Sequence, residues 1–154
     1  MSEAESKRLH LLHPEVGPRV IQLFDVCRKN GMRLFLGSTL RTISEQAKLK
    51  ADGKSTLKVG WHCLGRAADI YPYVRDKMDN FNPDFNGTDV AAFREMQKEA
   101  MAIGFRQIGF NPDWTKHYIM TTKGKVWDAG HVEWRAPYAT LADAVKAEGA
   151  EHGL

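Results

Sequence analysis

Two side chains near the middle of the chain have types that could bind one metal ion. His62 and Asp69 stand seven residues apart. A fully extended segment of that length would span roughly 23 Å, which is too far for two ligands of one ion. Gly65 lies between them, and glycine accepts the backbone conformations that a tight turn requires. A bend at Gly65 would bring the imidazole and the carboxylate together, whereas without it they are an unrelated surface pair.

A second segment, residues 127–134, adds Asp128 and His131. His131 is a third candidate ligand, because two histidines and one carboxylate leave the fourth position of Zn²⁺ open, as catalytic zinc sites do. Zinc would lower the pKa of its water to about 7, and Asp128 would then act as general base and protonate the leaving amine. An acid three residues before a histidine is common by itself, and these ligands also suit other divalent transition metals.

Together the two segments resemble a family of zinc peptidases. The pattern His-x-x-Gly-x-Ala-x-Asp, which starts at His62, is followed some sixty residues later by an acid, two residues and a histidine. This order is similar to D-alanyl-D-alanine carboxypeptidases and dipeptidases, and most of all to the short L-alanyl-D-glutamate endopeptidases that bacteriophages use as endolysins. The resemblance implies that His62, Asp69 and His131 bind zinc and that Asp128 is the catalytic acid/base.

The same family has an arginine in a Ser/Thr-rich turn, followed a few residues later by a glutamine. Here the pattern falls on Arg41 and Gln46. The resemblance implies that Arg41 polarises the scissile carbonyl and stabilises the oxyanion, whereas the alternative for both residues is a surface position at the start of a helix. The chain departs from the family at Gly60, where a serine or threonine is common, and at Asp128, where many relatives have glutamate.

Glu133 is a candidate for supporting the third ligand. It stands two residues after His131, so the two side chains share a face if the segment is a strand. We expect Glu133 either to orient His131 through a hydrogen bond or to be a solvated carboxylate.

The elements that position these residues follow from hydrophobic periodicity and turn signals. We expect an α+β fold in one small domain, residues 1–154, with an antiparallel sheet that carries the zinc site and helices packed on it. Helices are expected from Pro14 or Pro18 to Asn30, from Thr42 or Ser44 to Lys50, from Thr88 to Gly104 and from Leu141 to Glu148. Strands are expected over residues 32–37, 67–73, 105–110 and 131–135, with a polar loop over residues 75–89.

That polar loop is rich in Asp and Asn, as calcium loops are. In an EF-hand register, however, Asn82 and Phe93 would occupy the first and twelfth positions, where acids are required. We expect turns held by side-chain-to-backbone hydrogen bonds, while a looser ion site or a lid over the cleft stays open.

Composition excludes several classes of protein. Hydrophobic residues make up 43% and charged residues 27%, which is ordinary for a globular protein and not for a disordered one. The net charge of +3 is spread over scattered basic residues, which does not favour a nucleic-acid partner. The two cysteines, Cys27 and Cys63, do not form a disulfide framework. The sequence shows neither a signal peptide nor an apolar stretch long enough for membrane insertion.

These observations lead to one expected function and two alternatives. We expect a monomeric zinc endopeptidase that cuts the L-Ala–D-Glu bond of the peptidoglycan stem peptide as a phage endolysin. It would stay in the host bacterial cytoplasm until lysis and then act on the cell wall from the periplasm. The alternatives are a D-Ala-D-Ala carboxypeptidase or dipeptidase, and a non-catalytic zinc-containing domain for wall binding or signalling.

Overall fold

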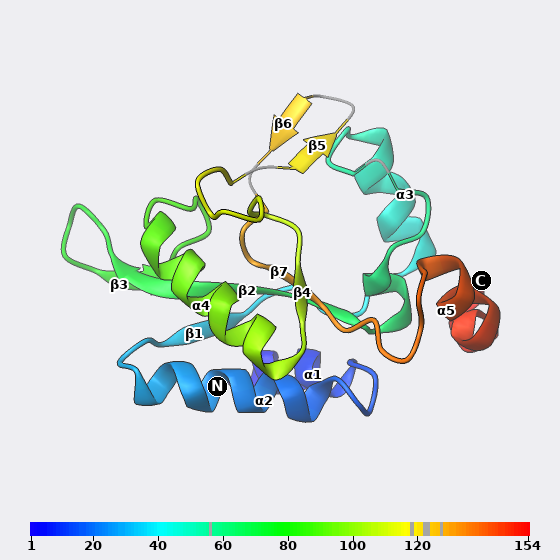
Figure 1. Ribbon diagram of the computed structural model, residues 1–154, viewed down its shortest axis with the longest axis horizontal. Coiled ribbons are helices and arrows are strands. Elements are labelled where there is room, and N and C mark those ends of the chain that lie inside the picture. Colours follow the sequence, from blue (N-terminus) through cyan, green and yellow to red (C-terminus); the bar gives the residue numbers. More distant parts are fainter. Residues whose placement is uncertain (56, 118, 122–123, 127) are drawn as a thin grey trace.

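An antiparallel sheet lies at the centre of the molecule (Figure 1). The structure is a computed structural model that describes residues 1–55, 57–117, 119–121, 124–126 and 128–154. Its strands are β1 (Leu34–Leu36), β2 (Ala67–Arg75), β3 (Phe81–Pro83), β4 (Arg106–Gln107), β5 (Ile119–Thr121), β6 (Gly124–Val126) and β7 (His131–Glu133). Within these residues the five-stranded sheet has the order β1-β2-β7-β4, with β3 paired to β2, and β5 and β6 form a separate pair.

Helices surround this sheet. They are α1 (Glu3–His10), α2 (Gly17–Lys29), α3 (Ile43–Ala51), α4 (Val90–Ile103) and α5 (Leu141–Glu148), with 3₁₀ turns η1 (Trp61–Leu64) and η2 (Gly149–His152). The buried sides of α2 and α4 pack against one face of the sheet and form the main core with it. The predicted α+β class, with helices packed on an antiparallel sheet, is confirmed. No helix among the described residues has the length and apolar character that a membrane span requires.

The longest strand, β2, explains how the sheet separates its two faces. Ala68 and Ile70 are fully buried and belong to the core. Asp69 and Tyr71 alternate with them, so they lie on the opposite face of the sheet. In the antiparallel pairing with β7, Asp69 stands directly opposite His131. Two predicted ligands from distant parts of the sequence therefore share one face of the sheet.

Helix starts follow local capping, with one correction to the sequence prediction. Thr42, and not Ser44, caps α3 in a capping box: its hydroxyl accepts from the Glu45 amide at 3.2 Å, while Glu45 accepts from the Thr42 amide at 2.8 Å. The predicted cap Thr88 of α4 is wrong. Asp89 caps this helix, because the Thr88 hydroxyl donates instead to the Asp84 carboxylate at 2.9 Å.

Some elements carry no strong hydrophobic pattern and were not predicted. The polar helix α1 has only Glu5 buried, and it begins with a capping box between Ser2 and Glu5. Strand β3 lies inside the segment that we expected to be all loop, and it pairs with the outer half of β2. Strand β4 is shorter than predicted, because the Gln107 side chain both accepts from the Phe110 amide and donates to its carbonyl.

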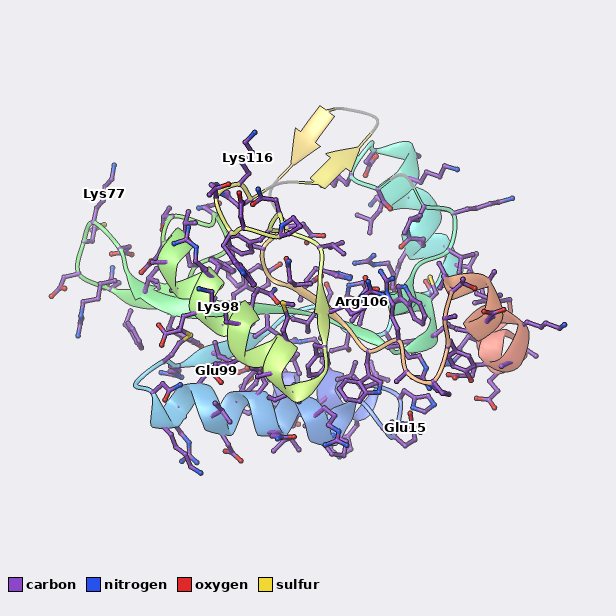
Figure 2. All side chains as sticks on the ribbon, viewed as in Figure 1. Glu15, Lys77, Lys98, Glu99, Arg106 and Lys116 are labelled. Carbon is purple, nitrogen blue, oxygen red and sulfur yellow. The ribbon has the colours of Figure 1, made fainter. Side chains whose placement is uncertain are left out.

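Long-range polar contacts fasten the outer elements. Figure 2 shows Glu99 on the side of α4 that faces α2, and its carboxylate accepts from the Asn30 side chain at 3.3 Å. At the other end of the sheet, Arg66 is 1% exposed and its Nε donates to Glu148 of α5 at 2.9 Å. Glu15, in the α1–α2 connection, lies 3.6 Å from the same guanidinium. The α1–α2 connection and α5 thus meet beside the start of β2.

Candidate functional site

The turn at Gly65 joins the first two predicted ligands. Gly65 has a φ of 66°, the left-handed conformation that favours glycine. A Cβ at this position would also lie 3.0 Å from the backbone atoms Leu11 O and His13 N. The chain reverses here between η1, which holds His62, and β2, which holds Asp69. The predicted bend at Gly65 is confirmed.

The three predicted ligands converge on one point. Nε2 of His62 lies 3.3 Å from Oδ1 of Asp69, and Nδ1 of His131 lies 3.4 Å from the same oxygen. One ligand atom from each residue falls within 4.8 Å of the other two. The side chains of His62, Asp69 and His131 are 4%, 14% and 10% exposed. A buried cluster of this kind needs either protons or a cation between its members.

Each histidine is oriented by an acceptor on its other ring nitrogen. Nδ1 of His62 lies 2.6 Å from the carbonyl oxygen of Thr39. Nε2 of His131 lies 3.1 Å from Oε1 of Glu133. A carbonyl and a carboxylate only accept, so these two nitrogens carry the protons. Nε2 of His62 and Nδ1 of His131 are then the nitrogens that face Asp69, and a metal ion bound there would displace the protons between them and the carboxylate.

Charge in the cluster moves the pKa values of two of its members. Burial alone would raise the pKa of Asp69, but the charges of His62 and His131 and their hydrogen bonds hold it well below its usual range. Burial alone would lower the pKa of His131, but hydrogen bonds to Asp69 and Glu133 raise it to about 10. The carboxylate therefore stays ionised, and a positive charge is stabilised beside it.

The donor set and its spacing fit a zinc ion. Zinc binds histidine nitrogens and carboxylate oxygens at about 2.0–2.2 Å in tetrahedral sites, so its ligand atoms are about 3.3–3.6 Å apart. The two distances from Asp69 Oδ1, 3.3 and 3.4 Å, match this spacing. In zinc sites, a ligand histidine commonly donates its other ring N–H to a carboxylate or a carbonyl, as His131 and His62 do here. The described residues of this cluster can hold a metal ion, and its chemistry favours zinc.

Arg41 and Gln46, both predicted from the sequence, lie together at the same cluster. Nη2 of Arg41 is 3.8 Å from Oδ2 of Asp69, and its Nη1 donates to Oε1 of Gln46 at 2.9 Å. Gln46 is 1% exposed, and its Nε2 donates to Ser55 and to the Leu57 carbonyl. Gln46 is thus not a surface residue at a helix start: it fixes the direction of the Arg41 guanidinium.

Asp128 is held near the cluster by its backbone. The His131 amide donates to the Asp128 carbonyl at 3.4 Å. Gly109 allows close packing here, because a Cβ on it would lie 2.4 Å from that same carbonyl oxygen. Burial of the carboxyl, with a further contribution from the charge of Asp69, raises the pKa of Asp128 to about 7. An acid with this pKa exchanges protons readily at neutral pH.

Several contributors to the site were not found from the sequence. Arg135 is one of them, and it forms an ion pair with the predicted residue Glu133. Gln97 of α4 donates from Nε2 to the Ala129 carbonyl and to the His131 carbonyl, the latter at 3.0 Å. Thr39 acts through its carbonyl oxygen, for which any residue type would serve, so no sequence signal identifies it. Two features of the sequence could have helped to find these contributors: Arg135 stands two residues after Glu133, and Gly109 is small enough for close packing.

Tyr71 is a further neighbour of the cluster. Its ring lies over two glycines of the adjoining strands: a Cβ on Gly37 would come 2.8 Å from the ring, and one on Gly130 would come 3.4 Å from it. Burial, together with the charges of Asp69 and Asp128, raises the pKa of Tyr71. The phenol is therefore neutral and lies on the same face of the sheet as the candidate ligands.

The Asp/Asn-rich loop contains the predicted side-chain-to-backbone turns. The buried Asp84 carboxylate accepts from the amides of Thr88 and Asp89 at 3.0 and 2.8 Å. Asp76 accepts in the same way from the amides of Met78 and Asn80, at 2.8 and 2.9 Å. The Asp84 and Asp76 carboxylates therefore stabilise the turns of this loop through hydrogen bonds to its own backbone.

Comparison with known proteins gives a likeness at the level of the fold. No model of a protein family and no curated protein matches the sequence. The structure of the L-Ala D-Glu endopeptidase ChiX from Serratia marcescens is similar, with a TM-score of 0.59 and 15% identity, over 94% of this chain and 92% of that one.

Two structures of the vancomycin-resistance enzyme VanY are also similar. VanYB in complex with D-alanine-D-alanine has a TM-score of 0.52 and 19% identity, over 91% of this chain and 78% of that one. A variant of the D,D-pentapeptidase VanY in complex with Zn(II) has a TM-score of 0.51 and 18% identity, over 93% of this chain and 84% of that one. The chain therefore has the fold that these peptidases share.

Proposed function

We propose that the protein is a zinc-dependent peptidase that acts on the stem peptides of peptidoglycan. The observation that carries this proposal is the pair of acceptor-bound histidines, whose second ring nitrogens face Asp69 at 3.3 and 3.4 Å. The fold likeness to an L-Ala D-Glu endopeptidase and to a VanY structure with Zn(II) supports the choice of reaction and metal. The motif resemblance in the sequence points to the same chemistry.

The residues divide into ligands and reacting groups. His62, Asp69 and His131 would hold Zn²⁺, which when bound supplies a Lewis acid for the peptide carbonyl and lowers the pKa of water to about 7. Asp128, whose pKa is about 7, takes the proton of the attacking water and returns it to the leaving amine. Arg41 donates hydrogen bonds to the carbonyl oxygen as negative charge develops on it.

Two further residues position this machinery. Glu133 accepts from His131 and fixes the imidazole that faces Asp69. Gln46 accepts from Arg41 and is itself held by the segment that follows α3. A guanidinium that is already fixed loses little freedom when it binds the developing charge.

The bond we propose is that between L-Ala and D-Glu. In support, the likeness to the endopeptidase ChiX extends over 92% of that chain, against 78% and 84% of the two VanY chains. The competing product is free D-alanine or D-alanyl-D-alanine, because one VanY structure holds that dipeptide. A monomeric endolysin of a bacteriophage, present in the host cytoplasm until lysis and then active at the cell wall, is the biological role we propose, with the motif resemblance as its support.

The test is digestion of purified peptidoglycan, followed by mass spectrometry of the fragments. Zinc-loaded protein is expected to release fragments with a new N-terminal D-Glu, and chelation is expected to abolish this activity until zinc is restored. Free D-alanine among the products would move the enzyme to the carboxypeptidases. Intact peptidoglycan, with zinc stoichiometrically bound, would refute the proposed reaction and favour a non-catalytic wall-binding or signalling domain.

The role of the base is tested separately with Asp128→Asn. Removing the proton acceptor is expected to lower turnover by about 10²–10⁴-fold without loss of zinc. A variant that keeps wild-type turnover would show that another group accepts the proton. Lysis of susceptible cells by the protein added outside, after permeabilisation, would test the proposed biological role.

A further inference from the structure

A second feature of the ligand-bearing face is a continuous set of aromatic side chains. Rings of neighbouring members lie 4.9–6.5 Å apart between centroids, in edge-on or tilted contacts. The set runs from Tyr71, beside the candidate site, through Phe85 and Phe35 to Tyr73 and then Phe81. We call these five residues the aromatic row.

The sheet itself places the aromatic row beside the ligands. Asp69, Tyr71 and Tyr73 alternate along β2 and so share one face. Phe35 of β1 stands opposite Tyr71 in the register. At about 3.3 Å per residue, Tyr71 starts roughly 7 Å from Asp69 along the strand and Tyr73 roughly 13 Å. Figure 1 shows β2 crossing the molecule toward β3, which pairs with Tyr73 and the residues after it, so Tyr71 and Tyr73 lie on the β3 side of Asp69 along the strand.

Two members of the aromatic row are open to solvent. Phe81 is 45% and Phe85 57% exposed. Isolated exposed aromatics are ordinary, but a connected strip beside a candidate site is typical of a binding surface. Phe85 is also held in place, because the neighbouring Asp84 is 4% exposed and accepts from Thr88 and Asp89. The ring is therefore presented by a loop with its own internal hydrogen bonds.

Guanidinium groups stack on two rings of the aromatic row. The Arg33 guanidinium lies 4.2 Å from the centroid of Tyr73, and that of Arg75 lies 5.7 Å from the centroid of Phe81. Arginine supplies several donors and no acceptor. Arg75 also pairs with the exposed Asp79 at 3.5 Å. The surface therefore offers flat apolar faces together with donors, chiefly from Arg33, for carbonyl or hydroxyl oxygens.

We propose that the aromatic row binds the amino sugar that carries the stem peptide. This inference rests on the proposed cleavage next to L-Ala. In peptidoglycan, L-Ala is joined to the lactyl group of the muramyl sugar, so the sugar lies about one residue from the scissile bond. One residue spans at most about 3.6 Å, and with the lactyl link the sugar ring falls beside Tyr71 and Phe85 when the bond is at the metal.

The chemistry of a pyranose fits this surface. Its axial C–H groups form an apolar face that packs on aromatic rings, while its acetamido and hydroxyl oxygens accept hydrogen bonds from guanidinium groups. A free stem peptide offers no such ring. An enzyme that uses the aromatic row would therefore prefer a glycan-linked stem to the same peptide without sugar.

The experiment compares two substrates with the same scissile bond: a disaccharide-linked stem peptide and the free stem peptide. The wild-type, zinc-loaded protein is expected to have a higher kcat/KM for the linked substrate. The double variant Phe81→Ala/Phe85→Ala is expected to lower the ratio of the two kcat/KM values by about tenfold. Phe85→Leu keeps an apolar side chain without a flat ring and is expected to lower the ratio as well.

Met101→Ala is the matched control, because Met101 is 48% exposed on α4 and lies outside the aromatic row. It is expected to leave the ratio at the wild-type value. An unchanged ratio in both phenylalanine variants would overturn the inference. An equal loss on both substrates would overturn it too, since the surface would then bind the peptide itself.

Binding is measured without turnover by NMR titration of the zinc-loaded protein with the free disaccharide. Shifts at the rings of Tyr73, Phe81 and Phe85 are expected, and their absence at saturating sugar contradicts the inference. This measurement separates the two proposals. Sugar binding without hydrolysis would count against the proposed peptidase reaction only, whereas hydrolysis without sugar binding would count against the aromatic row only.

Discussion

At the candidate metal centre, the orientation of each histidine ring depends on the acceptor at its second nitrogen. His131 is held by Glu133 at 3.1 Å, and Glu133 is itself 3% exposed and paired with Arg135. This carboxylate raises the basicity of the imidazole and fixes which ring nitrogen faces Asp69. The same logic applies to His62, with the Thr39 carbonyl as acceptor.

The first prediction concerns Glu133→Gln. The amide is a weaker acceptor and carries no charge, so zinc affinity is expected to fall by about 10–100-fold. Competition with a chromogenic chelator measures the change. Glu95→Gln, on the exposed side of α4, is the control and should keep wild-type affinity. An unaltered affinity in Glu133→Gln would mean that the carboxylate does not support the ligand.

The second prediction concerns Gln46→Ala. Without its acceptor at 2.9 Å, the Arg41 guanidinium loses its fixed direction, and kcat is expected to fall by about tenfold or more. Zinc content, measured by elemental analysis, should not change because Gln46 touches no ligand atom. Gln46→Glu keeps an acceptor for Arg41 but loses the donor to the Leu57 carbonyl, so it is expected to recover only part of kcat. A loss of zinc in Gln46→Ala would instead indicate a structural role.

At the scale of elements, the site depends on how closely the N-terminal segment approaches the turn before β2. Gly65 combines a positive φ with backbone neighbours at 3.0 Å. Gly31 also has a positive φ, of 82°, but nothing lies within 4 Å of its Cβ position. The two glycines therefore separate the cost of the conformation from the cost of close packing.

The third prediction compares Gly65→Ala with Gly31→Ala. The left-handed conformation costs a residue with a Cβ about 1–2 kcal/mol, and only Gly65→Ala also meets backbone atoms. The free energy of unfolding, measured by urea denaturation, is expected to fall by about 1 kcal/mol in Gly31→Ala and by distinctly more in Gly65→Ala. Gly65→Ala is also expected to weaken zinc binding. Equal losses would show that the backbone moves aside at little cost.

The sequence predicted those parts of the site that depend on residue type. Gly65 could be read as a turn, and Asp69 and His131 as strand residues, because their chemistry restricts what can stand there. Strand pairing brings Asp69 opposite His131, and no local pattern contains that register. The acceptor on His62 is the main-chain oxygen of Thr39, which leaves no trace in the sequence.

The same reasoning explains which elements were found. The helices α2 and α4 have regular buried stripes, such as Val20, Leu23 and Cys27 in α2. Strand β3 is short and lies at the edge of the sheet, where its residues are exposed or half-buried. It is therefore defined by pairing with β2 and not by its own hydrophobicity.

For the whole molecule, the Arg66–Glu148 pair links α5 to the residue that precedes β2, and Glu15 of the α1–α2 connection lies 3.6 Å from the same guanidinium. Burial would raise the pKa of Glu148, but hydrogen bonds from Arg66 and Tyr138 and the charge of Arg66 hold it below its usual value of 4.5. A carboxyl whose pKa is lower in the folded state stabilises that state above pH 4.5. This contribution is lost as the pH falls through the folded pKa.

The fourth prediction follows for Glu148→Ala. Because Arg66 is 1% exposed, removing its partner is expected to lower the free energy of unfolding at neutral pH by about 3 kcal/mol. The difference from wild type should shrink as the pH falls from 4.5 through the lower pKa of the folded state, because below that pKa the wild-type carboxyl is protonated in both states. Denaturant titrations at a series of pH values measure both effects.

Glu151→Gln, on the exposed side of η2, serves as the control and should follow the wild-type curve at every pH. A difference between wild type and Glu148→Ala that stays constant with pH would mean that the charge of Glu148 contributes nothing, and that the loss comes from packing alone.

Apart from the Arg41 side chain, the segment that follows β1 serves the candidate site through its main chain. Ser38 O accepts from the Asp69 amide at 2.9 Å, Thr39 O lies 2.6 Å from the His62 ring, and the Arg41 amide donates to His62 O at 3.0 Å. The Ser38 side chain is exposed and supplies none of these contacts. For the proposed peptidase this is an opportunity: position 38 adjoins the candidate site and can be randomised to select new substrate preferences while the scaffold around the candidate ligands is left intact.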